Sequence, residues 1–152
     1  MTAVREATPD DAEALIELRV IMLEGVGRPP AHLDWVPAAV AGLQAQLAQG
    51  SMIAVVAEAD GVVVSGGIAR FWQQLPGVDD DGSRGHVFSV ATRPAFRRRG
   101  LGRAVVRRLV DTLDARGVAR VDLTASAEGI ELYRSLGFVP SEDPLLRRRR
   151  PR

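Results

Sequence analysis

Apolar positions at helical spacing, together with helix-ending glycines, predict four helices. Thr8 and Pro9 suit the start of the first helix, because a threonine side chain caps free N–H groups and proline fits the first helical position. In the third helix, Leu101, Val105 and Leu109 recur along one side, which is the pattern of a helix that packs on a core. The predicted helices span 7–23, 38–50, 101–117 and 127–137.

Runs of strand-forming residues separate these helices. Two β-branched runs flank Asp60-Gly61, a dipeptide that favours the tight turn of a β-hairpin. Strands are predicted at 2–7, on both sides of that turn within 51–74, at 86–92 and 118–126, and late in the chain at 138–140 and around Leu145. The order β-α-α-β-β-β-α-β-α-β indicates a mixed α/β fold in which helices flank a single sheet.

The length and composition fit one globular domain, which we place at residues 1–144. The chain has 152 residues, of which 46% are hydrophobic and 26% are charged, as in an ordinary globular protein. No apolar run approaches the ~20 residues that a membrane helix needs, and the start of the chain has no apolar signal core. A cytoplasmic location without membrane contact is therefore the default expectation.

Cysteine and lysine are absent, and each absence excludes classes of function. Without cysteine there is no disulfide, no thiolate metal site and no cysteine nucleophile. Without lysine there is no Walker-type phosphate loop, which needs Gly-Lys-Ser/Thr. His32 and His86 do not form a metal-binding spacing with the scattered carboxylates, so we expect no metal.

All 20 basic residues are arginines, and they are unevenly distributed. Five of them lie in 145–152, an arginine-rich tail that we expect to be a frayed end or a last strand. The other 15 stand against 19 acidic residues in 1–144, so this body has a formal charge of −4. An acidic body argues against general nucleic-acid binding.

The segment "RPAFRRRGLGRA", from Arg93 to Ala104, carries the clearest chemical signal. It joins a predicted strand to a predicted helix, where free N–H groups and the helix dipole favour an anion. The residues alone leave three interpretations: a tight turn with solvated arginines, a dinucleotide-binding loop, or a cradle for another phosphate group. The dinucleotide fingerprint fits poorly, because it expects glycine or alanine where Val105 stands and an early place in a βαβ unit.

Two motifs in the right order resemble the GNAT superfamily of N-acetyltransferases. Arg97-x-x-Gly100-x-Gly102 is similar to the family's Arg/Gln-x-x-Gly-x-Gly/Ala signature. The segment "ELYRSLGF" at 131–138 looks like the family's Leu-Tyr-x-x-Leu-Gly-Phe segment. The first helix, the hairpin and the helix-ending Gly117 also fit, so the resemblance spans most of the chain and implies the GNAT fold.

This resemblance implies that the loop binds the pyrophosphate of acetyl-CoA. In the family, the strand before the loop separates from its neighbour and pairs with the pantetheine arm. The N–H that corresponds to that of Val90 polarises the acetyl carbonyl. Thr92 stands where valine is usual, and Ser126 lies near the place of an asparagine that touches coenzyme A in many relatives. The implied binding residues are Val90, Ala91, Thr92, Arg97, Arg98, Arg99, Gly100, Leu101, Gly102, Arg103 and Ser126.

The resemblance also implies direct transfer of the acetyl group to a primary amine, with Tyr133 as the acid for the leaving thiolate. His86 lies eleven residues before Arg97, where some branches of the family carry a catalytic glutamate. With an unperturbed pKa near ~6.5, His86 could remove the amine proton or hold a water that does so. Glu58 and Ser89 are further candidates for the base, and a water alone is another.

The amine acceptor, a small molecule or a peptide, would lie between the first two helices and the hairpin. The resemblance allows a homodimer, and the acidic loop 78–82 is expected to be solvated or to gate the site. Two other functions stay open: a non-catalytic acyl-CoA sensor, which needs no Tyr133, and a nucleic-acid binder using 97–103 and 147–152. Candidate residues on the acceptor side are Met22, Glu24, His32, Trp35, Phe71 and Trp72.

Overall fold

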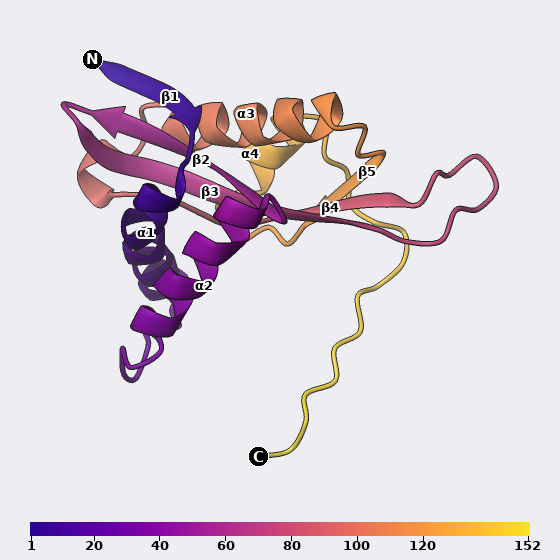
Figure 1. Cartoon of the computed structure of the whole chain (residues 1–152), viewed down its shortest axis with the longest axis horizontal. Helices are drawn as coiled ribbons and strands as arrows, with labels where there is room; N and C mark the ends of the chain where they lie inside the picture. Colours follow the sequence, from indigo (N-terminus) through magenta and orange to yellow (C-terminus); the bar gives the residue numbers. More distant parts are fainter.

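The computed structural model covers residues 1–152 and shows one sheet with helices on both faces (Figure 1). The first four strands are antiparallel neighbours in chain order, and the fifth runs parallel to the fourth at one edge. This arrangement confirms the predicted mixed α/β fold. The strands are β1 (Thr2–Glu6), β2 (Met52–Ala59), β3 (Val62–Gln73), β4 (Ser83–Thr92) and β5 (Arg120–Leu123), and the helices are α1 (Ala12–Gly25), α2 (Val36–Gln49), α3 (Leu101–Ala115) and α4 (Ile130–Ser135).

The sheet separates two hydrophobic cores. Successive side chains of a strand point to opposite faces, so Ala54 and Val56 of β2 pack with α1 and α2, whereas Ile53 and Val55 pack with α3. Both faces are covered, which explains why β2 reads as a continuous apolar run and not as an alternating one. Figure 1 shows α3 on one side of the sheet and the α1–α2 pair on the other.

The turn between β2 and β3 is the tight one that the sequence predicted. Asp60 and Gly61 have φ values of 52° and 78°, and positive φ at both central residues matches the twist of a two-residue hairpin. Gly117, which was expected to end α3, lies just past Ala115 with φ 76°. Its left-handed conformation is the usual helix stop.

A β-bulge interrupts the pairing of β3 with β4. Gly66 lies opposite Ala91 and Ile68 lies opposite Phe88, so the two residues between Phe88 and Ala91 share the single partner Gly67. Ser89, one of these two residues, has φ 54°. A bulge bends the strand that carries the extra residue, so it changes the course of β4 just before Val90–Thr92.

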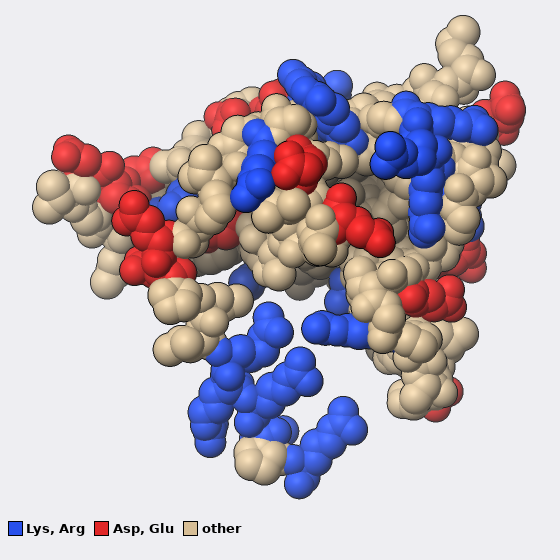
Figure 2. Space-filling view, turned by 180° about the vertical axis from the view of Figure 1, so that it is seen from behind, with Lys and Arg blue, Asp and Glu red and all other residues tan.

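The predicted last strand does not form. The chain after α4 has no regular structure, and every residue from Val139 to Arg152 is exposed. Pro140 and Pro144 cannot donate a hydrogen bond to a sheet, and the run 147–150 has no apolar side to bury. The segment extends away from the body in Figure 1, and the basic side chains at its end stand apart in the space-filling view (Figure 2).

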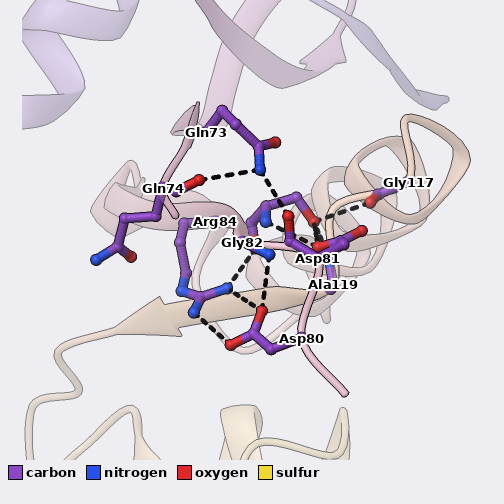
Figure 3. Close-up of polar contacts among 9 residues, drawn as sticks. Gln73, Gln74, Asp80, Asp81, Gly82, Arg84, Gly117 and Ala119 are labelled. Atoms are coloured by element: carbon purple, nitrogen blue, oxygen red, sulfur yellow. Dashed lines mark hydrogen bonds and ion pairs between the residues drawn. The ribbon is translucent and has the colours of Figure 1, made fainter. Parts of the chain in front are cut away.

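An ion pair and several hydrogen bonds hold the acidic loop between β3 and β4, so the structure shows it as an ordered loop and not as a detached gate (Figure 3). Arg84, a residue only 5% exposed, donates through its guanidinium to both carboxylate oxygens of Asp80 at 2.9 and 2.6 Å. Gly82 N donates to the same carboxylate at 2.8 Å, and Arg84 holds the pKa of Asp80 well below its usual range. Ser83 Oγ donates to Gly117 O at 3.1 Å and accepts from Ala119 N at 2.7 Å. These bonds fix the loop to the junction between α3 and β5.

Candidate active site

The turn into α3 presents a row of free hydrogen-bond donors. Six consecutive peptide N–H groups, from Arg98 to Arg103, make no hydrogen bond within the protein. Arg98 and Gly100 have φ values of 64° and 76°, and these left-handed residues lead the chain into the helix. Gly100 is the N-cap of α3 and has no side chain to occupy the donors. Free donors at the start of a 15-residue helix form an anion-binding site.

The arginine side chains of this loop differ in their partners. Arg97 Nε donates to Thr92 O at 3.2 Å, so its guanidinium lies back along the end of β4. The guanidinium of Arg99 stacks over the ring of Phe96, 5.0 Å from its centre. Arg98 and Arg103 are exposed and form no ion pair. None of the four arginines forms an ion pair, so all of them keep their charge near the turn, and Arg98 and Arg103 also make no hydrogen bond or ring contact within the protein.

The outer edge of β4 opens beside this loop. β5 pairs with β4 only at Arg84–Val87, and the rest of β4, Phe88–Thr92, has no strand on that side. The unpaired edge includes Val90, Ala91 and Thr92, the three strand residues predicted to face the pantetheine arm. A separation of β4 from β5 is what the sequence motifs implied, and an open edge can accept an extended ligand as an added strand.

The end of β4, the start of α3 and α4 meet at Gly102. A Cβ atom on Gly102 would lie 3.6 Å from Leu132 Cδ1 and 3.8 Å from Thr92 Oγ1. The Thr92 hydroxyl lies 2.8 Å from Ser65 Oγ, which also donates to Ala91 O at 3.1 Å. The contacts of Ser65 hold the backbone of the open edge. The contacts around Gly102 place α4, which carries Tyr133, next to the loop with the free N–H groups of Arg98–Arg103.

Tyr133 lies half-buried on α4 with its ring edge-on to Phe138, the centroids being 6.0 Å apart. Its hydroxyl makes no hydrogen bond within the protein. Burial raises the pKa of the Tyr133 hydroxyl, because removal from water disfavours the charged phenolate. The side chain is therefore protonated at neutral pH, as an acid must be.

His86 lies in the paired part of β4, on the face covered by α1 and α2. It stacks on Phe88 with ring centroids 6.0 Å apart, and it stands between Arg70 of β3 and Asp122 of β5. Burial, followed by the charge of Arg70, lowers the pKa of His86, while Asp122 acts in the opposite direction. A lowered pKa keeps the imidazole neutral at physiological pH, the state that can accept a proton.

Three other predicted residues occupy different settings. Ser126 Oγ accepts from Gly129 N at 3.2 Å, so the serine caps the turn that precedes α4. Glu58 receives a 2.6 Å hydrogen bond from Arg5 on the β1 side of the sheet, so one of its carboxylate oxygens is already paired. The Ser89 hydroxyl is buried in the bulge and has no hydrogen-bond partner.

The acceptor-side residues do not form one pocket. Trp35 lines a cavity of about 310 Å³ between α1, α2 and the sheet. Phe71 lies on the opposite face of the sheet from Trp72, because successive side chains of a strand alternate between the faces. It packs against the hydrophobic core on the α3 side, under the guanidinium of Arg116. The Trp72 ring lies under Arg70, 4.5 Å from the guanidinium carbon. Met22, Glu24 and His32 do not line this cavity.

The bulge at Ser89 is the part of the site that sequence reasoning missed. A Cβ on Gly67 would lie 3.0 Å from Leu109 Cδ1 and 3.2 Å from Val90 Cγ2, so a side chain there would crowd the bulged strand. Consecutive glycines inside a strand indicate a bulge or a close approach. The pair Gly66-Gly67 was therefore an available signal.

Two absences complete the description of the site. No group of three or more His, Asp or Glu side chains is placed to hold a metal ion. None of the helices combines the length and the apolar character that crossing a membrane requires.

Comparison with known proteins decides the family. The family model for the acetyltransferase (GNAT) family matches residues 21–138, well over half of the chain. The chain belongs to the GNAT acetyltransferase family. GNAT acetyltransferases use acetyl-CoA, so the acetyl donor implied by the two sequence motifs is that of the family.

Individual GNAT relatives match parts of the sequence. The [ribosomal protein bS18]-alanine N-acetyltransferase of Escherichia coli (strain K12) is 46% identical over 55 residues, 34% of this chain and 37% of the relative. The mycothiol acetyltransferase of Beutenbergia cavernae is 37% identical over 76 residues, 48% of this chain and 24% of the relative. The matches thus span about a third and a quarter of the length of these curated relatives.

Solved GNAT structures match the whole fold. A predicted acetyltransferase from Clostridium acetobutylicum, solved with acetyl-CoA, has a TM-score of 0.86 at 23% identity and covers 97% of this chain and 96% of its own. A GCN5-related N-acetyltransferase from Ralstonia eutropha has a TM-score of 0.85 at 25% identity, covering 97% and 98%. These likenesses confirm the fold that the sequence motifs implied.

Proposed function

We propose that this GNAT protein transfers the acetyl group of acetyl-CoA to a primary amine. The observation that carries the proposal is the row of six free N–H groups beside the unpaired edge of β4. In the reaction, the amine nitrogen bonds to the acetyl carbon and the bond from that carbon to sulfur breaks. The nitrogen gives up a proton, and the leaving thiolate takes one.

The residues of the loop and the open edge fit this donor. The N–H groups of Arg98–Arg103 have no partner within the protein and are available for a diphosphate at the helix start, and the guanidinium groups of Arg98 and Arg103 add charge. The unpaired backbone of Phe88–Thr92 can bond the amides of a pantetheine arm as an adjacent strand would. Contact with Ser126 stays a prediction, since its hydroxyl already accepts from Gly129.

Proton transfer is assigned to two side chains. His86, kept neutral by its lowered pKa, accepts the amine proton directly or through a water. Tyr133, kept protonated by burial, donates to the thiolate. The N–H of Val90 polarises the acetyl carbonyl. The acceptor is a primary amine of a small molecule or a peptide, and a homodimer stays a prediction.

Calorimetry with acetyl-CoA and with S-acetylpantetheine, which lacks the diphosphate and the 3′-phosphoadenosine attached to it, tests the loop. Several hydrogen bonds to a charged group are lost together, so we expect S-acetylpantetheine to bind at least ~100-fold more weakly. Gly102→Glu should abolish acetyl-CoA binding, because Gly102 has room for a side chain and the carboxylate would occupy the cradle. Arg107→Glu, a turn further along α3, is the control.

This control tests whether net charge alone explains a loss of binding, because Arg107→Glu changes the net charge by two and Gly102→Glu by only one. If the field of the whole protein governed binding, the control would weaken it more. Equal affinity for acetyl-CoA and S-acetylpantetheine would remove the loop from the site, and no affinity for acetyl-CoA at millimolar concentration would end the proposal.

A further inference from the structure

The cavity between α1, α2 and the sheet has an apolar lining and the size of a small-molecule site. Its volume is about 310 Å³, and seven of its ten lining residues are hydrophobic. Ile68 and Phe88 form its sheet side, and Leu43 belongs to its α2 side. Ligand pockets have volumes of roughly 300–1,000 Å³. This one therefore suits a small molecule with an apolar body and not a long polymer.

One charged side chain, Arg19 of α1, lines this apolar cavity. Arg19 is half-buried and pairs with no carboxylate, although α1 carries Glu17 two residues earlier. Glu17 already accepts from Arg93 at 2.8 Å. A half-buried guanidinium without an acidic partner favours a ligand with a planar anion, and carboxylate is the best geometric match.

The two other polar side chains of the cavity lining each form one hydrogen bond within the protein. The side-chain carbonyl of Gln46 accepts from Ser51 Oγ. Trp35 Nε1 donates to His32 O at 3.1 Å. The Gln46 NH2 remains a neutral donor, whereas Arg19 is the lining side chain with charged donors, and its charge is complementary to an anionic occupant.

The cavity also borders the proposed site of acetyl transfer. Phe88 lines it, His86 stacks on Phe88, and Val90 lies two residues further along β4. The bulge at Ser89 lies between Phe88 and Val90, so these two residues are close along the chain but not in regular strand register. A ligand with its apolar part in the cavity can therefore place an amine near His86 and the open edge of β4.

We infer that this cavity binds the acceptor, and that the acceptor is a small apolar amine that also carries a carboxylate, such as an amino acid with a hydrophobic side chain. Arg19 binds the carboxylate, the lining of the cavity holds the apolar side chain, and the amine faces β4. The inference rests on the proposed function, because only an acetyltransferase would use the bound amine as an acceptor. Binding of the carboxylate by Arg19 requires no acetyl transfer.

Calorimetry with L-phenylalanine and with phenethylamine, which lacks only the carboxylate, tests this inference. We expect L-phenylalanine to bind at least ~10-fold more tightly, the effect of a hydrogen-bonded charge pair. Arg19→Met should remove this preference by a similar factor, and Arg28→Met, at an exposed arginine just beyond α1, should leave it unchanged. Activity is followed in parallel as thiol release from acetyl-CoA with the same two amines.

Gly42→Leu provides a second, independent variant. A Cβ at Gly42 of α2 has no neighbouring atom within 4 Å, and Gly42 lines the cavity, so a leucine can begin there without a clash and we expect it to reduce the cavity. Leucine also favours a helix over glycine, so the variant should fold at least as well as the parent. It should weaken the binding of both ligands.

The results separate the two proposals. If L-phenylalanine does not bind at millimolar concentration, or binds equally well to the Arg19→Met protein, the inference is wrong even where other amines are acetylated. If L-phenylalanine binds through Arg19 but neither amine is acetylated while acetyl-CoA binds, the ligand class stands and the acetyltransferase proposal fails.

Discussion

Tyr133 is the single residue whose replacement separates acetyl transfer from coenzyme binding. Tyr133→Phe removes only the hydroxyl and keeps the ring that packs edge-on to Phe138. Because a positioned acid contributes roughly 10²–10⁴-fold to a rate, kcat should fall at least ~100-fold. The affinity for acetyl-CoA, measured by calorimetry, should stay the same.

Ser135→Ala is the control, since it removes an exposed hydroxyl from the same helix. If the Tyr133→Phe protein transferred acetyl groups at the parent rate, a water would have to protonate the thiolate. If no amine were acetylated by the parent protein that binds acetyl-CoA, the acyl-CoA sensor would be the better description.

The environment of His86 predicts a pH dependence with a defined sign. A base works when it is neutral, so kcat/KM should rise with pH through the pKa of His86. Burial and Arg70 lower that pKa, and the midpoint should therefore lie below the ordinary histidine value of ~6.5. Asp122→Asn should move the midpoint further down, and Arg70→Gln should move it up.

His86→Gln should abolish this limb of the pH profile, which is measured as initial rates of thiol release over acidic to neutral pH. The expected shifts are opposite for the two neighbouring variants, so a general loss of stability cannot reproduce them. A profile that is the same in all three variants would instead assign the base to water.

At the scale of elements, the loop between β3 and β4 owes its order to one ion pair. Asp80 accepts from Arg84 and from Gly82 N. The pKa of the Asp80 carboxyl is lowered, so its charge stabilises the fold at neutral pH. This contribution declines as the pH falls below the ordinary aspartate pKa, and it is lost completely once the pH has passed through the lowered value.

Asp80→Asn should lower the melting temperature and speed amide exchange at Gly82, because buried Arg84 loses its charged partner. Asp79→Asn is the matched control. Asp79 is exposed with φ 55°, a conformation that asparagine also tolerates. Equal exchange rates in the two variants would show that the hydrogen bonds of Gln73 and Ser83, and not the ion pair, hold the loop.

Elements with a local sequence signal were predictable, and those that depend on distant contacts were not. The stripe Leu101–Leu113 and the turn Asp60-Gly61 carry their own periodicity and turn chemistry, and both formed as predicted. The prediction of a last strand was wrong, because a strand also needs a neighbouring strand to pair with. The prolines of this segment cannot donate backbone hydrogen bonds, and its exposed arginines provide no apolar face.

The same contrast holds within the site. Gly100 and Gly102 predicted the free donors of the loop, because a glycine N-cap leaves them free whatever surrounds the helix. The side on which Phe71 lies depends on strand register, and a shift of one residue turns a side chain to the other face. Arg19 has no carboxylate partner because the nearby Glu17 pairs with Arg93, which is distant in the sequence. No local sequence pattern predicts such an unpaired arginine.

On the scale of the whole molecule, the arginines divide into a body set and a tail set (Figure 2). In the body, acidic residues outnumber arginines and several pairs are formed, as at Arg5, Arg84 and Arg93. The arginines of 147–152 are all exposed and unpaired. Any attraction to nucleic acid should therefore come from the tail.

Deletion of 145–152 tests this division. Because these residues are exposed and form no strand, the melting temperature and the affinity for acetyl-CoA should not change. Binding to a labelled single-stranded oligonucleotide, followed by anisotropy at low salt, should be weak, steeply salt-dependent and lost in the deletion variant. Binding that survived the deletion would contradict the assignment to the tail, and competition of that binding by acetyl-CoA would show that nucleic acid and the diphosphate share the N–H groups of the Arg98–Arg103 loop.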